Sequence, residues 1–183
     1  MQHPFEQIPA HLRQRVFWIL VVLTLLVETV LSITGAPLTT NAAPAGIVSF
    51  EFATTTTGAE SILASWGVVA RERAAFVQGL DFLFIPLYVA AIGLGCIMAA
   101  DVLSRKKWRV AAIGRWLAWG LVLAGLLDVI ENIALLVMLF AAPAQPWAWI
   151  AARCAASKFA LVILGLFYAL LGGVVYGFTR KSE

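Results

Sequence analysis

The stretch WLAWGLVLAGLLDVIENIALLVMLF, residues 116–140, indicates the fold class of this chain. It is almost entirely apolar, and it exceeds the roughly 20 helical residues that cross the hydrocarbon core of a bilayer. Three polar side chains, Asp128, Glu131 and Asn132, nevertheless lie near its middle. The stretch therefore predicts a transmembrane helix, and its polar residues indicate where a functional site is to be sought.

The composition of the whole chain agrees with a membrane protein. Of its 183 residues, 62% are hydrophobic and 13% are charged, and the mean hydropathy is +0.91. A soluble domain of this size could not bury so many apolar side chains. We expect an all-α integral membrane protein, a four-helix transmembrane bundle with an outer interfacial helix, as a single domain over residues 1–183. The expected spans are about 16–34, 78–100, 116–140 and 150–178.

Basic residues beside the spans set the expected orientation. They lie before the first span, between the second and third, and after the last, and the positive-inside rule places such clusters in the cytoplasm. We therefore expect a multi-pass protein of the plasma (inner) membrane with cytoplasmic N- and C-termini. Arg71 and Arg73 in the first outer loop count against this orientation. The clusters that favour it are His11, Arg13 and Arg15; Arg105, Lys106, Lys107, Arg109 and Arg115; and Arg180 and Lys181.

The outer segment between the first two spans is too long for a simple connection. One part of it, VSFEF, alternates like a strand, but a lone strand would leave its backbone unpaired at a membrane. We expect instead an interfacial helix over about 44–70 that begins near Pro44. Asn41 or Thr40 would cap it, and the threonine run and Gly58 would interrupt it. The side chains expected to enter lipid or protein are Phe50, Ile62, Leu63 and Trp66.

Each expected span brings an ionisable side chain to a similar depth. Residues three or four apart share a helix face, so Asp128, Glu131 and Asn132 point the same way. The cost of exposing them to lipid turns that face toward the other helices. Along the helix axes, one ionisable group of each span lies about 10 to 15 Å from the outer end. The candidate ligand-binding residues are Glu28, Asp81, Asp128, Glu131, Asn132 and Lys158.

Acids outnumber bases in this group. Four carboxyl groups accompany one lysine, Lys158, so either some carboxyl groups keep their protons or a cation or polar ligand joins them. The alternative is that these residues only hold the helices together, each contributing roughly 0.6 kcal/mol. Glu131 and Lys158 would then form a structural ion pair.

Motifs for known chemistry are missing from the sequence. It has no P-loop, nucleotide fingerprint or Ser–His–Asp set, its cysteines form no CxxC pair, and His3 and His11 fall outside the spans. We expect no cofactor, no metal and no nucleic acid. The sequence assigns no catalytic residue and does not decide whether the chain is an enzyme. Membrane lipids and a small amphiphilic ligand are the expected partners, and a homo-oligomer is left open.

Four segments carry a resemblance to other proteins. They are LDFLFIPLY (80–88), LLDVIENIALL (126–136), SKFALVILGLFY (157–168) and IVSFEFA (47–53). These segments resemble uncharacterised four-span bacterial integral membrane proteins that have no assigned activity. The resemblance implies only that the segments belong together.

Three functions fit these features. The first is an outer-leaflet pocket that binds or handles a small amphiphile or lipid-like molecule. In it Lys158 would hold an anionic group, Glu131 would orient Lys158 or act as a base, and Asn132 would donate a hydrogen bond. The second is a proton- or cation-coupled small transporter, and the third is a structural or accessory membrane subunit. Because the inner halves of the spans carry almost no ionisable group, the first is favoured over the second.

Overall fold

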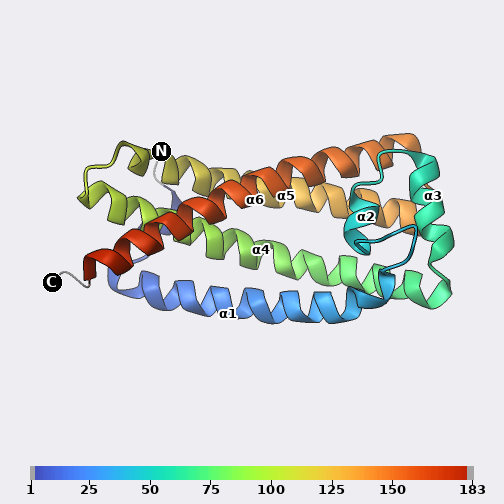
Figure 1. Ribbon diagram of the computed structural model, residues 1–183, viewed down its shortest axis with the longest axis horizontal. Coiled ribbons are helices and arrows are strands. Elements are labelled where there is room, and N and C mark those ends of the chain that lie inside the picture. Colours follow the sequence, from blue (N-terminus) through green and yellow to red (C-terminus); the bar gives the residue numbers. More distant parts are fainter. Residues whose placement is uncertain (1–2, 181–183) are drawn as a thin grey trace. The chain divides into compact units, whose positions relative to one another are not determined.

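The computed structural model describes residues 3–180, without the side chains of residues 179 and 180, and every regular element in that range is a helix (Figure 1). The all-α prediction is therefore confirmed for the described residues. The short elements are η1 (Pro4–Gln7), η2 (Ala36–Leu38), α2 (Ile47–Glu51), α3 (Thr56–Ser65) and η3 (Arg109–Ala112). The long helices are α1 (Ala10–Gly35), α4 (Val68–Arg105), α5 (Ile113–Phe140) and α6 (Gln145–Arg180).

The four long helices are each long and apolar enough to cross a membrane. The four expected spans lie inside them, but the helices continue beyond the expected ends. α4, with 38 residues, is about 57 Å long, whereas the hydrocarbon core is about 30 Å thick. Polar residues at a helix end can stay helical once they have reached water, so hydropathy alone underestimates helix length.

The chain forms two compact units, and each long helix contributes one stretch to each of them. Unit 1 comprises Met1–Thr24, Leu87–Gly125 and Lys158–Glu183. Unit 2 comprises Leu25–Pro86 and Leu126–Ser157, and it also contains α2 and α3.

Small residues bring helices close together in unit 1. A Cβ atom added at Gly172 of α6 would overlap the side chain and the backbone of Ala99 in α4. One added at Gly114 of α5 would come within 2.8 Å of both the Ala100 side chain and the Cys96 carbonyl. Glycine at these positions therefore lets the backbones approach, the role that small residues commonly have between membrane helices.

The segment between α1 and α4 differs from its prediction. The helix expected over 44–70 is interrupted at the threonine run, as predicted, but Gly58 lies inside α3, and neither Asn41 nor Thr40 caps the first part. α2 begins after Gly46, whose φ of +58° suits glycine, and the Thr40 hydroxyl instead accepts a hydrogen bond from the Ala43 amide. Thr55 starts a new helix because its hydroxyl accepts the Gly58 amide of α3. No strand is present between residues 3 and 180.

α2 and α3 pack into the apolar core of unit 2. The rings of Phe50 and Trp66 meet edge to face with centroids 5.5 Å apart, and Trp66 Nε1 donates to the Leu38 carbonyl at 2.8 Å. Ile62 and Leu63 are buried in the same cluster. The four apolar side chains predicted to enter lipid or protein thus enter protein.

The Arg71 side chain binds carbonyl groups at the end of α3. Its guanidinium donates to the Leu63 carbonyl from Nε at 2.9 Å and from Nη2 at 2.6 Å, and Nε also reaches the Trp66 carbonyl. A cation is favourable at a helix C-terminus, where carbonyl groups lack helical partners. Arg71, which counted against the expected orientation, therefore has a local structural role.

Candidate functional site: buried polar groups of unit 2

The polar face predicted on α5 is buried. Asp128, Glu131 and Asn132 are between 0% and 3% exposed, whereas the neighbouring apolar residues Ile130 and Ile133 are about half exposed. This arrangement is the reverse of that in a soluble helix, and it fits a helix whose apolar side faces lipid. The inference that the polar stripe faces protein is confirmed.

One hydrogen bond joins α5 to α4 within unit 2. The Asn132 side chain donates from Nδ2 to Oδ2 of Asp81 at 2.6 Å. Such a short contact is typical of a charge-assisted bond, which is about twice as strong as a neutral one. Two of the predicted site residues, on different helices, are therefore brought together directly.

Gln78 is a part of this region that the sequence analysis missed. It precedes Asp81 by three residues and so shares its face of α4. Only 2% of Gln78 is exposed, and its Nε2 has no hydrogen-bond acceptor among the described residues. Leaving a buried donor unsatisfied costs roughly 1 to 3 kcal/mol. The spacing from Asp81 was the signal that could have identified it.

Glu51 is a second residue that the sequence analysis missed. It lies at the end of α2 and is 8% exposed, so the short helix also brings a carboxyl group into the interior of unit 2. No helical periodicity could reveal it, because α2 has only five residues.

One of the predicted site residues, Glu28, lies outside the buried face, and Lys158 belongs to the other unit. Glu28 is exposed on α1 in unit 2, so it is not part of the buried face. Lys158 is buried and begins the α6 stretch of unit 1, where its Nζ lies 5.2 Å from the centroid of the Phe159 ring. Unit 2 thus joins Asp81 to Asn132 and buries Asp128 and Glu131 on the same face of α5.

The chemistry of the unit 2 group is hydrogen bonding and charge. Across residues 3–180, no three His, Cys, Asp or Glu side chains are grouped as a metal ion would need. The group offers carboxylate acceptors together with carboxamide donors from Asn132 and Gln78. It can therefore recognise a polar group that both donates and accepts hydrogen bonds.

Unit 1 contains a different polar region around its N-terminal segment. A cavity of about 230 Å³ is lined by Glu6, Asp101 and Arg115 together with small and apolar residues. Its charged groups are already paired, since Arg115 binds Glu6 and Arg13 binds Asp101, both at 2.6 Å. The charged groups that line the cavity are therefore engaged with one another and with Arg13 inside unit 1.

His3, which precedes the first span, is buried in unit 1. Its ring packs against Phe5 and Trp119, and its Nδ1 accepts the Phe5 amide at 3.2 Å. Burial lowers the pKa of His3, partly opposed by Glu6 and by the Ala118 carbonyl. The pKa of Glu6 is lowered, first because its carboxylate accepts the His3 backbone amide and then because it binds Arg115.

Comparison with known proteins finds no matching family model, no matching curated protein and no matching solved structure. The function must therefore be argued from the chemistry of the site.

Proposed function

We propose that this chain is a four-span protein of the plasma membrane, with cytoplasmic termini, that binds a small amphiphilic molecule at the polar groups of unit 2. The ligand site comprises Gln78, Asp81 and Asn132, with Asp128 and Glu131 on the adjoining turns of α5. We further propose that it lies in the outer-leaflet half of the membrane, because the basic clusters flank the other ends of the spans.

The single observation that carries this proposal is the buried amide of Gln78. A buried donor without an acceptor is unfavourable, and such groups in native proteins call for an explanation. A ligand oxygen at Gln78 Nε2 would remove the cost. Asp81 lies on the same face of α4 and, with Asn132, could orient a hydroxyl group of that ligand.

The surroundings of the polar groups suggest that the rest of the ligand is apolar. The apolar core of unit 2 includes Leu135 and Met138, which lie on the same face of α5 as Glu131 and Asn132, together with Phe50 and Trp66. A molecule with one polar end and a short apolar chain matches both kinds of surface.

Native mass spectrometry of the protein extracted in mild detergent tests the proposal. The wild-type protein should retain an additional mass, and Gln78→Leu should lose it. Because the substitution removes an unsatisfied amide, the ligand-free variant should unfold at the same or a higher temperature than ligand-free wild type.

Glu28→Gln is the matched control, because Glu28 belongs to unit 2 but is exposed. It should retain the ligand. If the wild-type protein carries no additional mass, or if Gln78→Leu retains it, the proposed site is wrong.

A structural or accessory role is the second candidate, and α1 favours it. Only Leu31 of its 26 residues is buried, so large apolar side chains are exposed along its whole length. Lipid covers such a helix in a monomer and a partner helix covers it in an assembly. Measurement of the mass of the protein–detergent complex distinguishes these arrangements.

A further inference from the structure

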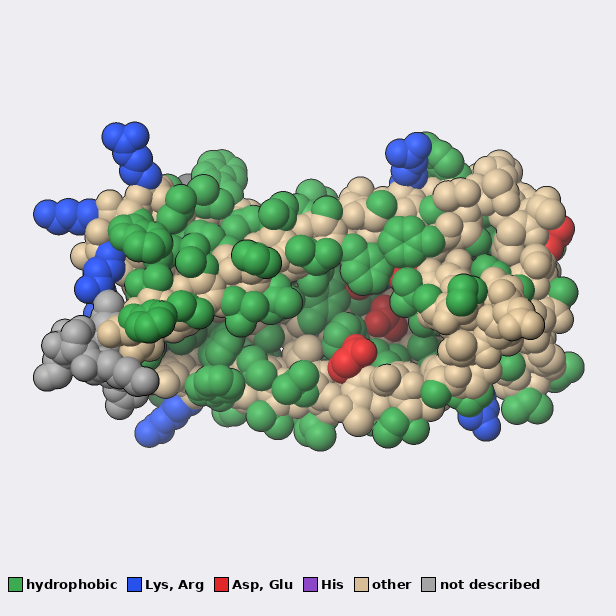
Figure 2. All heavy atoms as spheres, viewed as in Figure 1, with side chains coloured by type: hydrophobic (Ala, Val, Ile, Leu, Met, Phe, Trp, Pro, Cys, Tyr) green, Lys and Arg blue, Asp and Glu red, His purple; other side chains and the backbone are tan. Residues whose placement is uncertain are grey.

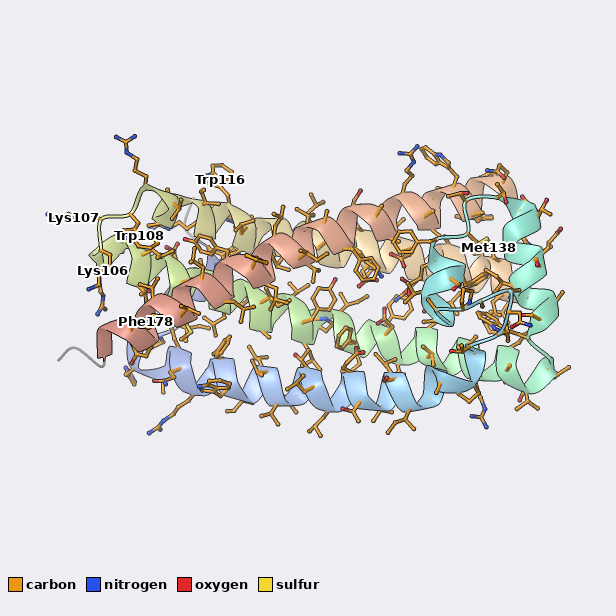
Figure 3. All side chains as sticks on the ribbon, in the orientation of Figure 1. Lys106, Lys107, Trp108, Trp116, Met138 and Phe178 are labelled. Carbon is orange, nitrogen blue, oxygen red and sulfur yellow. The ribbon has the colours of Figure 1, made fainter. Side chains whose placement is uncertain are left out.

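The connection between α4 and α5 combines positive charge with exposed aromatic rings. We call residues 105–116 the α4–α5 surface. Lys106, Lys107 and Trp108 project from it in Figure 3, and Trp116 projects from the start of α5. Figure 2 shows Lys and Arg side chains gathered around this connection. Trp108 is 46% and Trp116 79% exposed, although large aromatic side chains are usually buried.

Four of the five basic residues of this surface form no ion pair with the described residues. The fifth, Arg115, is bound to Glu6. Asp101, one turn before the end of α4, is already bound to Arg13. The four remaining basic residues are exposed, and they are Arg105, Lys106, Lys107 and Arg109.

A helix-end effect explains only part of this charge. Cations stabilise a helix C-terminus, which accounts for Arg105 in the last turn of α4 and for Lys106 beside it. Arg109, however, lies in η3, whose four residues are too few for a helix-end effect to account for its charge. The basic cluster thus extends beyond the C-terminus of α4, where positive charge would stabilise the fold.

Lys107 occupies a backbone position that favours glycine. Its φ is +57°, and it is the one non-glycine residue with positive φ among the described residues. The amides of Lys107 and Trp108 bind the carbonyls of Ser104 and Leu103, the bonding pattern of a helix end that usually has glycine at this position. A lysine here indicates that the charge has a use other than ending the helix.

We propose that the α4–α5 surface binds the phosphate headgroups of anionic phospholipids. Tryptophan prefers the headgroup level of a bilayer, and each Lys or Arg near an anionic membrane adds about a fivefold preference for it. Both features lie at the ends of two helices that are apolar enough to span that bilayer. This inference rests on the proposed membrane insertion and does not depend on the ligand of unit 2.

The experiment uses the full chain in nanodiscs that contain phosphatidylcholine and phosphatidylglycerol. After release into the gas phase, native mass spectrometry measures the ratio of the two lipids that stay bound. The wild-type protein should be enriched in phosphatidylglycerol, and Lys106→Gln with Lys107→Gln should reduce the enrichment at least tenfold at low salt. Arg73→Gln with Arg153→Gln removes the same charge from exposed positions in unit 2 and should leave it unchanged.

A second variant separates lipid binding from folding. Lys107→Gly relieves the unfavourable backbone conformation, so the protein should be at least as stable as wild type while its phosphatidylglycerol enrichment falls. The proposal is overturned if the Arg73 and Arg153 variant loses as much phosphatidylglycerol enrichment as the Lys106 and Lys107 variant. It is also overturned if the wild-type protein shows no preference for the anionic lipid. The unit 2 ligand is read in the same spectra and should persist in all these variants, so a failure of one proposal is distinguishable from a failure of the other.

Discussion

The two units distribute charge in opposite ways. The sequence ranges of unit 1 hold ten of the thirteen Lys and Arg residues, and those of unit 2 hold seven of the ten Asp and Glu residues. In unit 1 the described charges are mostly exposed or paired, as in Arg115 with Glu6, whereas unit 2 buries Glu51, Asp128 and Glu131. Exposed charge costs little and suits recognition at a surface, whereas buried polar groups are costly unless protein or ligand satisfies them. Substitutions in each unit distinguish the exposed charge of unit 1 from the buried polar groups of unit 2.

The largest effect is expected in unit 2, from the bond between Asp81 and Asn132. Asn132→Leu leaves the Asp81 carboxylate without this donor and should reduce the free energy of unfolding by about 3 kcal/mol. Asp81→Leu with Asn132→Leu removes both partners and should recover much of that loss. Denaturation in detergent measures both values. Additive effects of the two single changes would mean that the bond contributes nothing.

A smaller effect is expected where helices approach in unit 1. Gly172→Ala forces a methyl group into Ala99 and should destabilise the protein by about 2 kcal/mol. Gly173→Ala is the matched control, because a Cβ atom there meets nothing within 4 Å. Alanine is the better helix former, so this control should be neutral or stabilising by up to ~1 kcal/mol. Equal thermal stability of the two variants would contradict the packing described for α4 and α6.

The end of α4 should show a gain in stability. Lys107→Gly removes the unfavourable left-handed conformation and should stabilise the protein by about 1 kcal/mol. Lys106→Gly, at a position without positive φ, loses the same charge and should not stabilise. If both variants are more stable than wild type, the gain in stability comes from the loss of charge and not from the backbone conformation.

Acid should weaken unit 1 by a smaller amount and in two steps. The folded pKa of His3 is lowered from 6.5, so the folded state binds a proton less readily and stability falls as the pH drops below 6.5. The folded pKa of Glu6 is lowered from 4.5, so its contribution is present above 4.5 and is lost as the pH falls through the folded value. Fluorescence of Trp119, which packs against His3, should follow the first step. His3→Phe should abolish that step and retain the second.

The sequence predicted the elements that depend on long apolar runs. Four such runs predicted four long helices, and the spacing of Asp128, Glu131 and Asn132 predicted one buried face on α5. Both follow from the periodicity of a helix and the cost of polar groups in lipid. The contact between Asp81 and Asn132 joins two residues that the sequence had placed in the same site.

Other features do not follow from the long apolar runs or from the charged residues within them. Gln78 is uncharged and therefore did not stand out as an intramembrane acid does. The exposure of Glu28 was not predicted, because its sequence position does not tell which face of α1 meets protein. His3 is buried because aromatic residues from two elements surround it, and Gly58 lies inside α3, not at the break, because its amide binds Thr55 at the start of that helix.

Labelling of introduced cysteines tests most directly the claim that the charged and the buried polar regions belong to a membrane-spanning chain. Ser104 lies at the end of α4 and Ser61 lies on α3, and both are exposed, so each is replaced by cysteine in turn. The native Cys96 and Cys154 are buried and are expected to stay unlabelled. With a membrane-impermeant maleimide, the Ser61→Cys variant should react in intact cells and the Ser104→Cys variant only in inverted membrane vesicles. Reaction of both variants from the same side, or of the Ser104→Cys variant from outside the cell, would contradict the account.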